Sequence, residues 1–165
     1  EETYFKIINS KTAALFAAAT RVGACITNKN GKEKDALESY GRNLGLAFQI
    51  ADDALDYYSS SKIFGKEIGK DFFEGKVTLP VIFIYQRANL GERTFLEKIF
   101  KKRNRSDEEF NQMQNLIKKY DSMAACFKCA EHFINISYNA LSIFKPSKEK
   151  SILQNLTSFI LERSF

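Results

Sequence analysis

The sequence predicts an all-α fold, and three of its features support that prediction. Apolar residues recur at intervals of three or four over long stretches, which is the spacing of one helix face. No segment of convincing length shows the strict alternation of a half-buried strand. Capping and breaking residues divide the chain into about six helices. With 165 residues the chain can bury one core, so we expect residues 1–165 to form a single helical domain.

The first two expected helices lie on either side of a strong turn signal. An Ala-rich segment at 11–27 ends in the turn sequence Asn-Lys-Asn-Gly at 28–31. Asn9 and Ser10 compete for backbone hydrogen bonds, so they predict a helix start or a kink just before residue 11. The second helix is expected over residues 32–58, where one apolar face contains Leu37, Tyr40, Leu44, Phe48, Ala51 and Leu55.

The middle of the chain loses this periodicity. Residues 59–77 begin with three serines and contain three glycines, so we expect a loop there. Thr78 is a candidate helix cap and Pro80 suits the first turn of a helix. An apolar helix is therefore expected from this point to about residue 87.

The rest of the chain is expected to be helical with two interruptions. Ser106 followed by Glu109 forms a capping box, so a long helical region begins there. Pro146 ends that region shortly after residue 144. Shorter helices are expected at about 91–101 and 152–161.

Composition narrows the functional classes. The net charge of +5, with a pI near 9.0, suits an anionic ligand or nucleic acid, and equally a protein without a charged partner. Three cysteines, an odd number, argue against a disulfide framework, so we expect a reducing, cytoplasmic compartment. The longest apolar runs, residues 13–20 and 78–85, are too short to span a bilayer. We expect neither a transmembrane segment nor a secretory signal.

Three aspartates lie together near the end of the second expected helix. Asp52 and Asp56 are four residues apart and share a helix face, with Asp53 at its edge. Like-charge repulsion and the apolar neighbours would disfavour their ionised forms. Mg²⁺ takes one or two carboxylates and fills its shell with water and phosphate oxygens, so it would neutralise them. The alternative is a solvated acidic face, and the aspartates alone support the two interpretations equally.

Basic and glycine residues on both sides of these aspartates favour the metal interpretation. Lys11 and Thr12 open the first expected helix, where an ammonium and a hydroxyl could reach a phosphate. Lys66 and Lys76 lie in the glycine-punctuated loop after the aspartates, with Asp71 between them. Each lysine alone would be a solvated surface residue. As a set with the carboxylates, they predict a metal-bridged polyphosphate site.

Two other patterns contain residue types that suit zinc or nucleic acid, but their contexts favour a structural interpretation. Cys126, Cys129 and His132 occupy successive helical turns, but tetrahedral zinc normally needs a fourth ligand and the chain has no other histidine. We therefore expect the thiols to pack in the core. The basic run at 101–105 would suit nucleic acid or an anionic membrane. Cations are favoured at helix carboxyl ends and no aromatic platform lies nearby, so we expect a solvated helix end and no nucleic-acid partner.

The order and spacing of the site motifs resemble those of the trans-prenyl (polyprenyl) diphosphate synthases, the farnesyl to octaprenyl diphosphate synthase class. One motif of this chain resembles the family's second aspartate-rich motif: Phe48-Gln49-x-x-Asp52-Asp53-x-x-Asp56. Its lysine–threonine pair resembles Lys11-Thr12. The stretch after its motif resembles Gly65-Lys66 through Asp71 to Lys76-x-Thr78-x-Pro80. The agreement covers residues 1 to about 85, and beyond residue 90 it rests on helical character alone.

The resemblance implies a helical bundle of the isoprenoid synthase type and a Mg²⁺-dependent prenyltransferase of isoprenoid biosynthesis. In that family, magnesium ions bridge two aspartate-rich motifs to an allylic diphosphate. The allylic carbon–oxygen bond ionises, and the carbocation alkylates isopentenyl diphosphate before a proton is lost. By this analogy Asp52, Asp53 and Asp56 would hold Mg²⁺, partly through water. Lys76 and Asp71 would support the metal and diphosphate cluster.

The resemblance also implies which residues contact the two substrates. Lys11 and Lys66 would bind the allylic diphosphate. Thr12 and Gln49 would contact the reacting region.

The resemblance extends over the carboxyl-terminal half of the family's chain only. The family's Gly-Gly-Lys-Arg segment and first aspartate-rich motif have no counterpart, since the chain has no Asp-Asp pair besides Asp52-Asp53. We therefore expect this chain alone to lack synthase activity unless another chain supplies the other half. The alternative is a non-catalytic partner subunit or split-gene product that acts in assembly. A half-bundle leaves apolar faces uncovered, so we expect a homo-oligomer or association with a chain that supplies the amino-terminal half.

Overall fold

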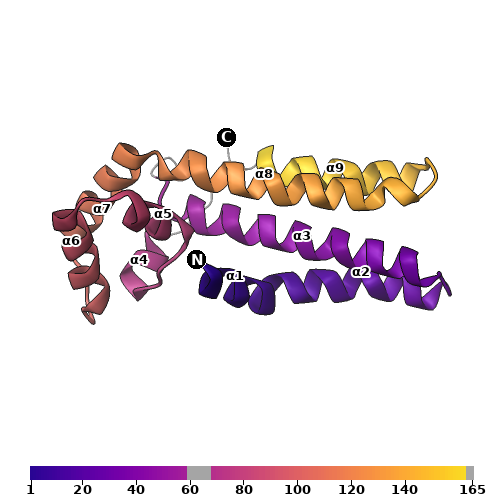
Figure 1. The fold of residues 1–165 in the computed structure, drawn as a ribbon, viewed down its shortest axis with the longest axis horizontal. Coiled ribbons are helices and arrows are strands. Elements are labelled where there is room, and N and C mark those ends of the chain that lie inside the picture. Colours follow the sequence, from indigo (N-terminus) through magenta and orange to yellow (C-terminus); the bar gives the residue numbers. More distant parts are fainter. Residues whose placement is uncertain (59–67, 163–165) are drawn as a thin grey trace. The chain divides into compact units, whose positions relative to one another are not determined.

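The computed structural model describes residues 1–58 and 68–162, and within them every regular element is helical (Figure 1). The all-α prediction is therefore confirmed. The chain divides into two compact units, which are described separately. The long-helix unit contains Glu2–Ala51 and Phe127–Phe165, and the short-helix unit contains Glu1 and Asp52–Cys126.

The elements follow one another along the chain in three groups. The first comprises α1 (Glu2–Ile8), the π-helical turn η1 (Asn9–Ala13), α2 (Ala14–Ile26) and α3 (Gly31–Leu55). The second comprises α4 (Lys70–Glu74), α5 (Leu79–Arg87), α6 (Leu90–Lys101) and α7 (Asp107–Tyr120). The third comprises α8 (Ser122–Ala140), the 3₁₀ turn η2 (Leu141–Ile143) and α9 (Lys148–Glu162).

Helix α3 is the central element of the long-helix unit. It lies beside α2, and the Thr20 hydroxyl of α2 donates to the Leu37 carbonyl at 2.6 Å (Figure 1). The buried Tyr40 connects α3 to the other two long helices. Its hydroxyl donates to the Leu153 carbonyl of α9 at 2.9 Å, and its carbonyl accepts from the Ser137 hydroxyl of α8 at 2.9 Å. These bonds satisfy polar groups inside the bundle, where an unpaired one would be costly.

Glycine allows α3 to approach the first helical segment closely. A Cβ atom at Gly45 would lie 2.7 Å from the Cα of Ala13, a backbone atom that cannot rotate away. Gly45→Ala is expected to lower the free energy of unfolding by about 1–3 kcal/mol through overpacking. The matched control is Gly23→Ala in α2, where a Cβ meets nothing within 4 Å, and it should stabilise the helix by about 0.5–1 kcal/mol. Urea unfolding of both variants tests this, and equal stability of the two would contradict it.

The short-helix unit has a core rich in aromatic residues. Phe72 of α4 is fully buried, and its ring centroid lies 5.3–5.8 Å from those of Phe73, Phe100 and Phe110. Aliphatic side chains from α5, α6 and α7 complete this core: Val81, Ile84, Leu96, Ile99, Met113 and Ile117. Helices α4 to α7 are short, so this shared core stabilises them more than their own hydrogen bonds do.

Several predicted helix boundaries agree with the structure. The capping box of Ser106 and Glu109 is present at the start of α7. A second capping box, of Asn89 and Glu92, starts α6 one residue before the expected position. Thr78 occupies the N-cap position of α5 with Pro80 in the first turn, but its hydroxyl makes no cap hydrogen bond. The prediction of Thr78 as the cap residue is therefore confirmed, although its side chain does not make the cap bond.

Two segments differ from the expected pattern of helices and loops. The region expected from residue 106 to 144 is interrupted at Asp121, whose left-handed backbone (φ 47°) separates α7 from α8. Helix α4 lies inside the segment expected to be a loop. Gly69 and Gly75 at its two ends both have φ 79°, a conformation that favours glycine.

The cysteines and the hydropathy pattern agree with the expectations drawn from composition. Cys25, Cys126 and Cys129 are not joined in disulfides, and Cys126 is fully buried. Over the part of the chain that the structure describes, no helix has the length and apolar character needed to cross a bilayer.

Candidate active site

The end of α3 and the start of α4 are joined through Asp56. Its carboxylate Oδ2 accepts from the Asp71 backbone N–H at 2.8 Å, and its carbonyl accepts from the Gly69 N–H at 2.7 Å. Burial raises the pKa of Asp56 to about 6, although the Asp71 N–H partly opposes this shift. A cation beside this carboxylate would favour its ionised form.

Asp52 and Asp53 occupy the last turn of α3. The Asp56 N–H donates to the Asp52 carbonyl at 3.2 Å, so the helical geometry that puts Asp52 and Asp56 on one face continues past the end of α3. Asp53 is buried, with 5% of its surface exposed, and Asp52 is partly exposed. The side chains therefore sit at different depths, which helical spacing alone does not predict.

Lys76 and Asp71 form an ion pair. The Lys76 ammonium lies 2.9 Å from Asp71 Oδ1 and 2.5 Å from Glu74 Oε2. These hydrogen bonds, the one to Glu74 first, raise the pKa of Lys76, so it stays cationic. The Lys76 N–H also donates to the Asp71 carbonyl at 2.9 Å, which closes the turn after α4.

Arg105 supports this turn, and its role was not predicted. Its guanidinium donates to the carbonyls of Phe73 at 3.3 Å and Phe100 at 3.1 Å. It also packs against Gly75, where a Cβ would lie 2.5 Å from Arg105 Nη2. The sequence placed Arg105 in a solvated basic run, and no local spacing signals bonds to residues 32 positions away.

Removing the Arg105 guanidinium should loosen the turn that carries Lys76. Arg105→Ala leaves two carbonyls without this donor, so we expect a loss of about 1–3 kcal/mol in the free energy of unfolding. The matched control is Arg103→Ala, at an exposed position two residues away, which should change stability by less than about 0.5 kcal/mol. Thermal unfolding followed by circular dichroism measures both, and identical melting curves for the two variants would refute this role.

The predicted residues of the long-helix unit lie on η1 and α3. The Thr12 hydroxyl donates to Gln49 Oε1 at 2.6 Å, which joins two residues that the sequence assigned to one function. Lys11 is exposed on the same turn. A helix start or kink was expected before Lys11, but the chain is helical from Glu2 and has a π-helical turn at Asn9–Ala13, a feature that often marks functional sites.

The π-helical turn is held by a contact that the sequence did not reveal. Arg42 Nη1 of α3 donates to Asn9 Oδ1 at 2.9 Å, while its Nη2 donates to Glu38 at 2.8 Å. Asn9 was expected to disturb the helix by bonding its own backbone, but it bonds a side chain 33 residues away. Lys66, the remaining predicted residue, lies outside the described residues.

The number of side chains placed to hold one metal ion limits both the zinc and the magnesium hypothesis. In residues 1–58 and 68–162, no three His, Cys, Asp or Glu side chains are placed to hold one metal ion. The alternative zinc set of Cys126, Cys129 and His132 is therefore not assembled. For magnesium the same observation means that these residues would supply fewer than three ligands. Mg²⁺ is usually bound through one or two carboxylates together with substrate phosphates.

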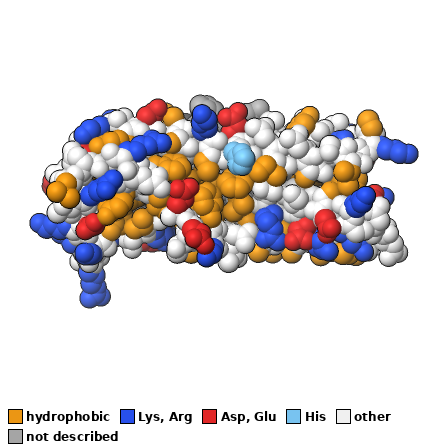
Figure 2. All heavy atoms as spheres, in the orientation of Figure 1, with side chains coloured by type: hydrophobic (Ala, Val, Ile, Leu, Met, Phe, Trp, Pro, Cys, Tyr) orange, Lys and Arg blue, Asp and Glu red, His pale blue; other side chains and the backbone are white. Residues whose placement is uncertain are grey.

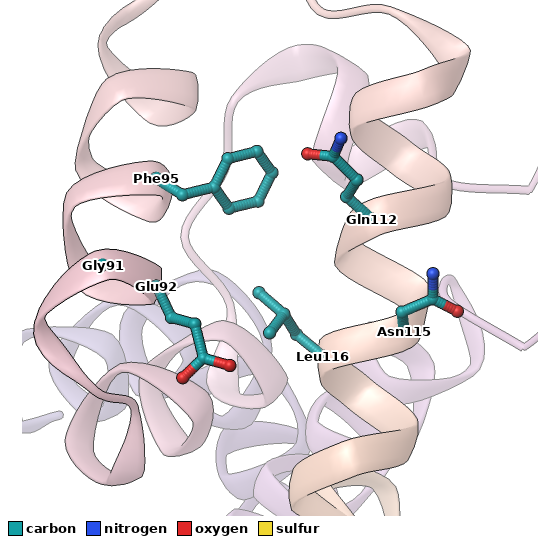
Figure 3. Close-up of a pocket in the computed structure, with 6 residues that line it drawn as sticks. All are labelled: Gly91, Glu92, Phe95, Gln112, Asn115 and Leu116. Carbon is teal, nitrogen blue, oxygen red and sulfur yellow. The ribbon is translucent and has the colours of Figure 1, made fainter.

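A pocket in the short-helix unit contains none of the predicted site residues. It has a volume of about 290 Å³ and lies between α6 and α7. Phe95 and Leu116 point into it, and Gln112, Asn115 and Glu92 lie around it (Figure 3). The Glu92 carboxylate is already bound by the Lys119 ammonium at 2.6 Å and the Tyr120 hydroxyl at 2.5 Å. This pocket is therefore a poor candidate for an anionic substrate.

Comparison with known proteins identifies a family for this chain. Residues 1–117 match the model of the polyprenyl synthetase family. A short chain isoprenyl diphosphate synthase of Methanothermobacter thermautotrophicus is 36% identical over 164 residues, which are 99% of this chain and 50% of that protein. Component 2 of the heptaprenyl diphosphate synthase of Bacillus subtilis is 29% identical, over 99% of this chain and 46% of its own length.

A solved structure shares the fold over the same extent. The polyprenyl synthase of Caulobacter crescentus, solved in complex with calcium and isoprenyl diphosphate, matches with a TM-score of 0.93 and 36% identity. The match covers 100% of this chain and 50% of that one. The chain thus spans about half the length of the relatives it matches. The chain belongs to the polyprenyl synthetase family.

Proposed function

We propose that this chain supplies the carboxyl-terminal half of a prenyltransferase active site, which condenses an allylic diphosphate with isopentenyl diphosphate. The observation that carries the proposal is the linked set of Asp56, Asp71 and Lys76. A carboxylate at the end of α3 is bonded to the segment that holds a paired lysine. The family match, together with relatives named as isoprenyl diphosphate synthases, supports this assignment.

The donor set suits magnesium. Asp52, Asp53 and Asp56 offer hard carboxylate oxygens, and the raised pKa of Asp56 reflects a buried environment in which a cation would stabilise the charged form. When bound, Mg²⁺ would neutralise charge on the diphosphate and stabilise its departure from the allylic carbon. Of these three carboxylates, Asp52 and Asp56 are partly exposed and Asp53 is buried.

The other residues bind and orient the substrates. Lys11 is exposed on the π-helical turn, where its ammonium would bind diphosphate oxygens together with Lys66. The hydrogen bond between Thr12 and Gln49 fixes the orientation of both side chains. They would then present a fixed polar surface to the reacting region. Lys76, held by Asp71 and Glu74, would add a fixed positive charge at low reorganisation cost.

The share of the relatives that the chain matches supports the rest of the proposal. The chain matches about half of each relative described above, so the first aspartate-rich motif and the isopentenyl diphosphate segment would belong to an amino-terminal half. The name of the Bacillus subtilis relative, component 2, supports a synthase assembled from more than one kind of chain. A cytoplasmic enzyme fits the free thiols.

Calorimetric titration of inorganic pyrophosphate into the purified chain tests the ligand site. We expect binding when Mg²⁺ is present and none when it is replaced by EDTA. Lys11→Ala should weaken that binding, and Lys29→Ala, which removes an exposed lysine elsewhere in the long-helix unit, should not. The non-catalytic assembly subunit would show no magnesium-dependent binding, so that result would overturn the proposal.

A further inference from the structure

The buried positions of the first helical segment change their spacing at the π-helical turn. Tyr4 and Ile8 of α1 are buried and lie four residues apart, which is the spacing of one α-helix face. Ile8 and the next buried residue, Ala13, lie five residues apart. Within this interval the Ala14 N–H donates to the Asn9 carbonyl, five positions earlier. The turn therefore contains one residue more than an α-helical turn.

An ordinary α-helix through this segment would bury a different set of side chains. Counting back from Ala13 in steps of four gives Asn9 and Phe5. These two residues would replace Ile8 and Tyr4 on the buried face, and the Asn9 amide would then need a partner inside the bundle. An α-helix turns about 100° per residue, so α1 would rotate by about that angle relative to α2. The register therefore sets the directions of the side chains in the turn and before it.

A hydrogen bond to α3 satisfies the Asn9 side chain in the π-helical register. Arg42 Nη1 donates to Asn9 Oδ1 at 2.9 Å, and Arg42 Nη2 donates to Glu38 Oε1 at 2.8 Å. The hydrogen bond from Arg42, with a further one from Arg21, holds the pKa of Glu38 below its ordinary value, so Glu38 stays ionised and holds Arg42 in place. Figure 2 shows acidic and basic side chains gathered where α2 and α3 lie side by side.

The π-helical turn contacts one face of α3 at both of its ends. Arg42, Gly45 and Gln49 are three and four residues apart, so they lie on the same face of that helix. Arg42 binds the first residue of the turn, whereas Gln49 accepts from the Thr12 hydroxyl at 2.6 Å. Gly45 lets the backbone of Ala13 approach, since a Cβ there would be 2.7 Å from the Ala13 Cα. These contacts fit the turn only in the register that the structure shows.

We propose that Asn9 and Arg42 are positioning residues for Lys11. Their hydrogen bond fixes residues 9–13 in the π-helical register, and this register sets the direction of the exposed Lys11 side chain. A single polar residue can specify the register of packed helices by making the alternative packing costly, and Asn9 has that role here. The inference rests on the proposed function, in which Lys11 binds diphosphate, and it deepens that function by naming the residues that orient the lysine.

Pyrophosphate titration measures whether Lys11 depends on this hydrogen bond. With Mg²⁺ present, Asn9→Ala and Arg42→Ala should each weaken pyrophosphate binding about tenfold, the size of one lost charge-assisted hydrogen bond. Adding Asn9→Ala to a Lys11→Ala background should cause no further loss, because the bond acts through that lysine. The matched control is Arg21→Ala, which removes a guanidinium bonded to Glu38 at 2.5 Å and should leave pyrophosphate binding unchanged.

Thiol labelling reports the register itself and needs no ligand. Ile8→Cys, in a Cys25→Ser and Cys129→Ser background, places a reporter at a position that is 3% exposed in the π-helical register. We expect Asn9→Ala to speed maleimide labelling of this reporter by about tenfold or more, because the change of register turns position 8 towards solvent. The native Cys126, which is fully buried, is the control in the same molecule and should stay unreactive unless the protein unfolds.

Asn9→Asp separates loss of the hydrogen bond from loss of the native side chain. It keeps an oxygen acceptor for Arg42, so the reporter should stay protected in this variant while it is labelled in Asn9→Ala. Circular dichroism checks that each reporter variant folds. If Ile8→Cys does not fold, Tyr4→Cys replaces it at a position that is 6% exposed.

Three results would overturn the inference. The first is a reporter that stays protected in Asn9→Ala, and the second is labelling of the reporter and Cys126 together, which would show general unfolding. The third is pyrophosphate binding that Asn9→Ala leaves unchanged, or weakens equally in the Lys11→Ala background. A failure of the unaltered chain to bind pyrophosphate would refute the proposed function and with it the role of Lys11. The labelling rates would still decide whether the bond between Asn9 and Arg42 fixes the register.

Discussion

Asp52→Asn is expected to weaken magnesium-dependent pyrophosphate binding by about two orders of magnitude. A metal bound to a phosphoryl oxygen contributes several kcal/mol of charge stabilisation, and an amide in place of a carboxylate loses the ligand charge while keeping its shape. Asp52 suits this test because it is partly exposed, whereas Asp53 is buried. Titration calorimetry of the variant gives the change in affinity directly.

The control for this substitution is Asp107→Asn, which removes an exposed carboxylate from the first turn of α7. It produces the same change in net charge without touching α3. An unchanged affinity in Asp52→Asn would show that this carboxylate is not a metal ligand. An equal loss in Asp107→Asn would show that the effect is one of overall charge.

Phe72→Ala is expected to have the largest effect on stability, a loss of about 3–5 kcal/mol in the free energy of unfolding. The Phe72 ring is fully buried and touches the rings of Phe73, Phe100 and Phe110, so its removal opens a cavity among rigid neighbours. A loss of this size is a large fraction of the stability of an ordinary domain. Helix α4 and the turn after it, which carry Asp71 and Lys76, should therefore lose their fixed positions.

Urea unfolding measures this change, with Phe159→Ala as its control. Phe159 is an aromatic residue of α9 that is 54% exposed, so its truncation should cost less than about 1 kcal/mol in the isolated chain. Similar losses for the two variants would contradict the assignment of Phe72 as the centre of the short-helix core.

The helical fold could be predicted because its signals are local. Apolar periodicity located α3, and the Ser106–Glu109 capping box located the start of α7. The break at Asp121 could not be found, because a single residue in the left-handed conformation has no distinct sequence signal unless it is glycine. Helix α4 has 5 residues, which is too few for periodicity to reveal.

Some residues of the candidate site lie in contact, and their separation in the chain decides whether a local pattern could indicate the contact. Lys76 and Asp71 are five residues apart, and the structure pairs them. Thr12 and Gln49 are 37 residues apart, and the resemblance to a family brought them together where spacing could not. The supporting contacts of Arg105 and of the Asn9–Arg42 pair depend on tertiary packing, so no pattern in the sequence indicated them.

The central claim is that this chain is one half of a prenyl synthase active site. A steady-state assay with an allylic diphosphate and isopentenyl diphosphate tests it most directly, with the chain alone and with the amino-terminal half of the Caulobacter crescentus synthase added. The account predicts no turnover by either half alone, and magnesium-dependent turnover when the two are combined. Robust turnover by the chain alone, or none from the combined halves, would contradict it.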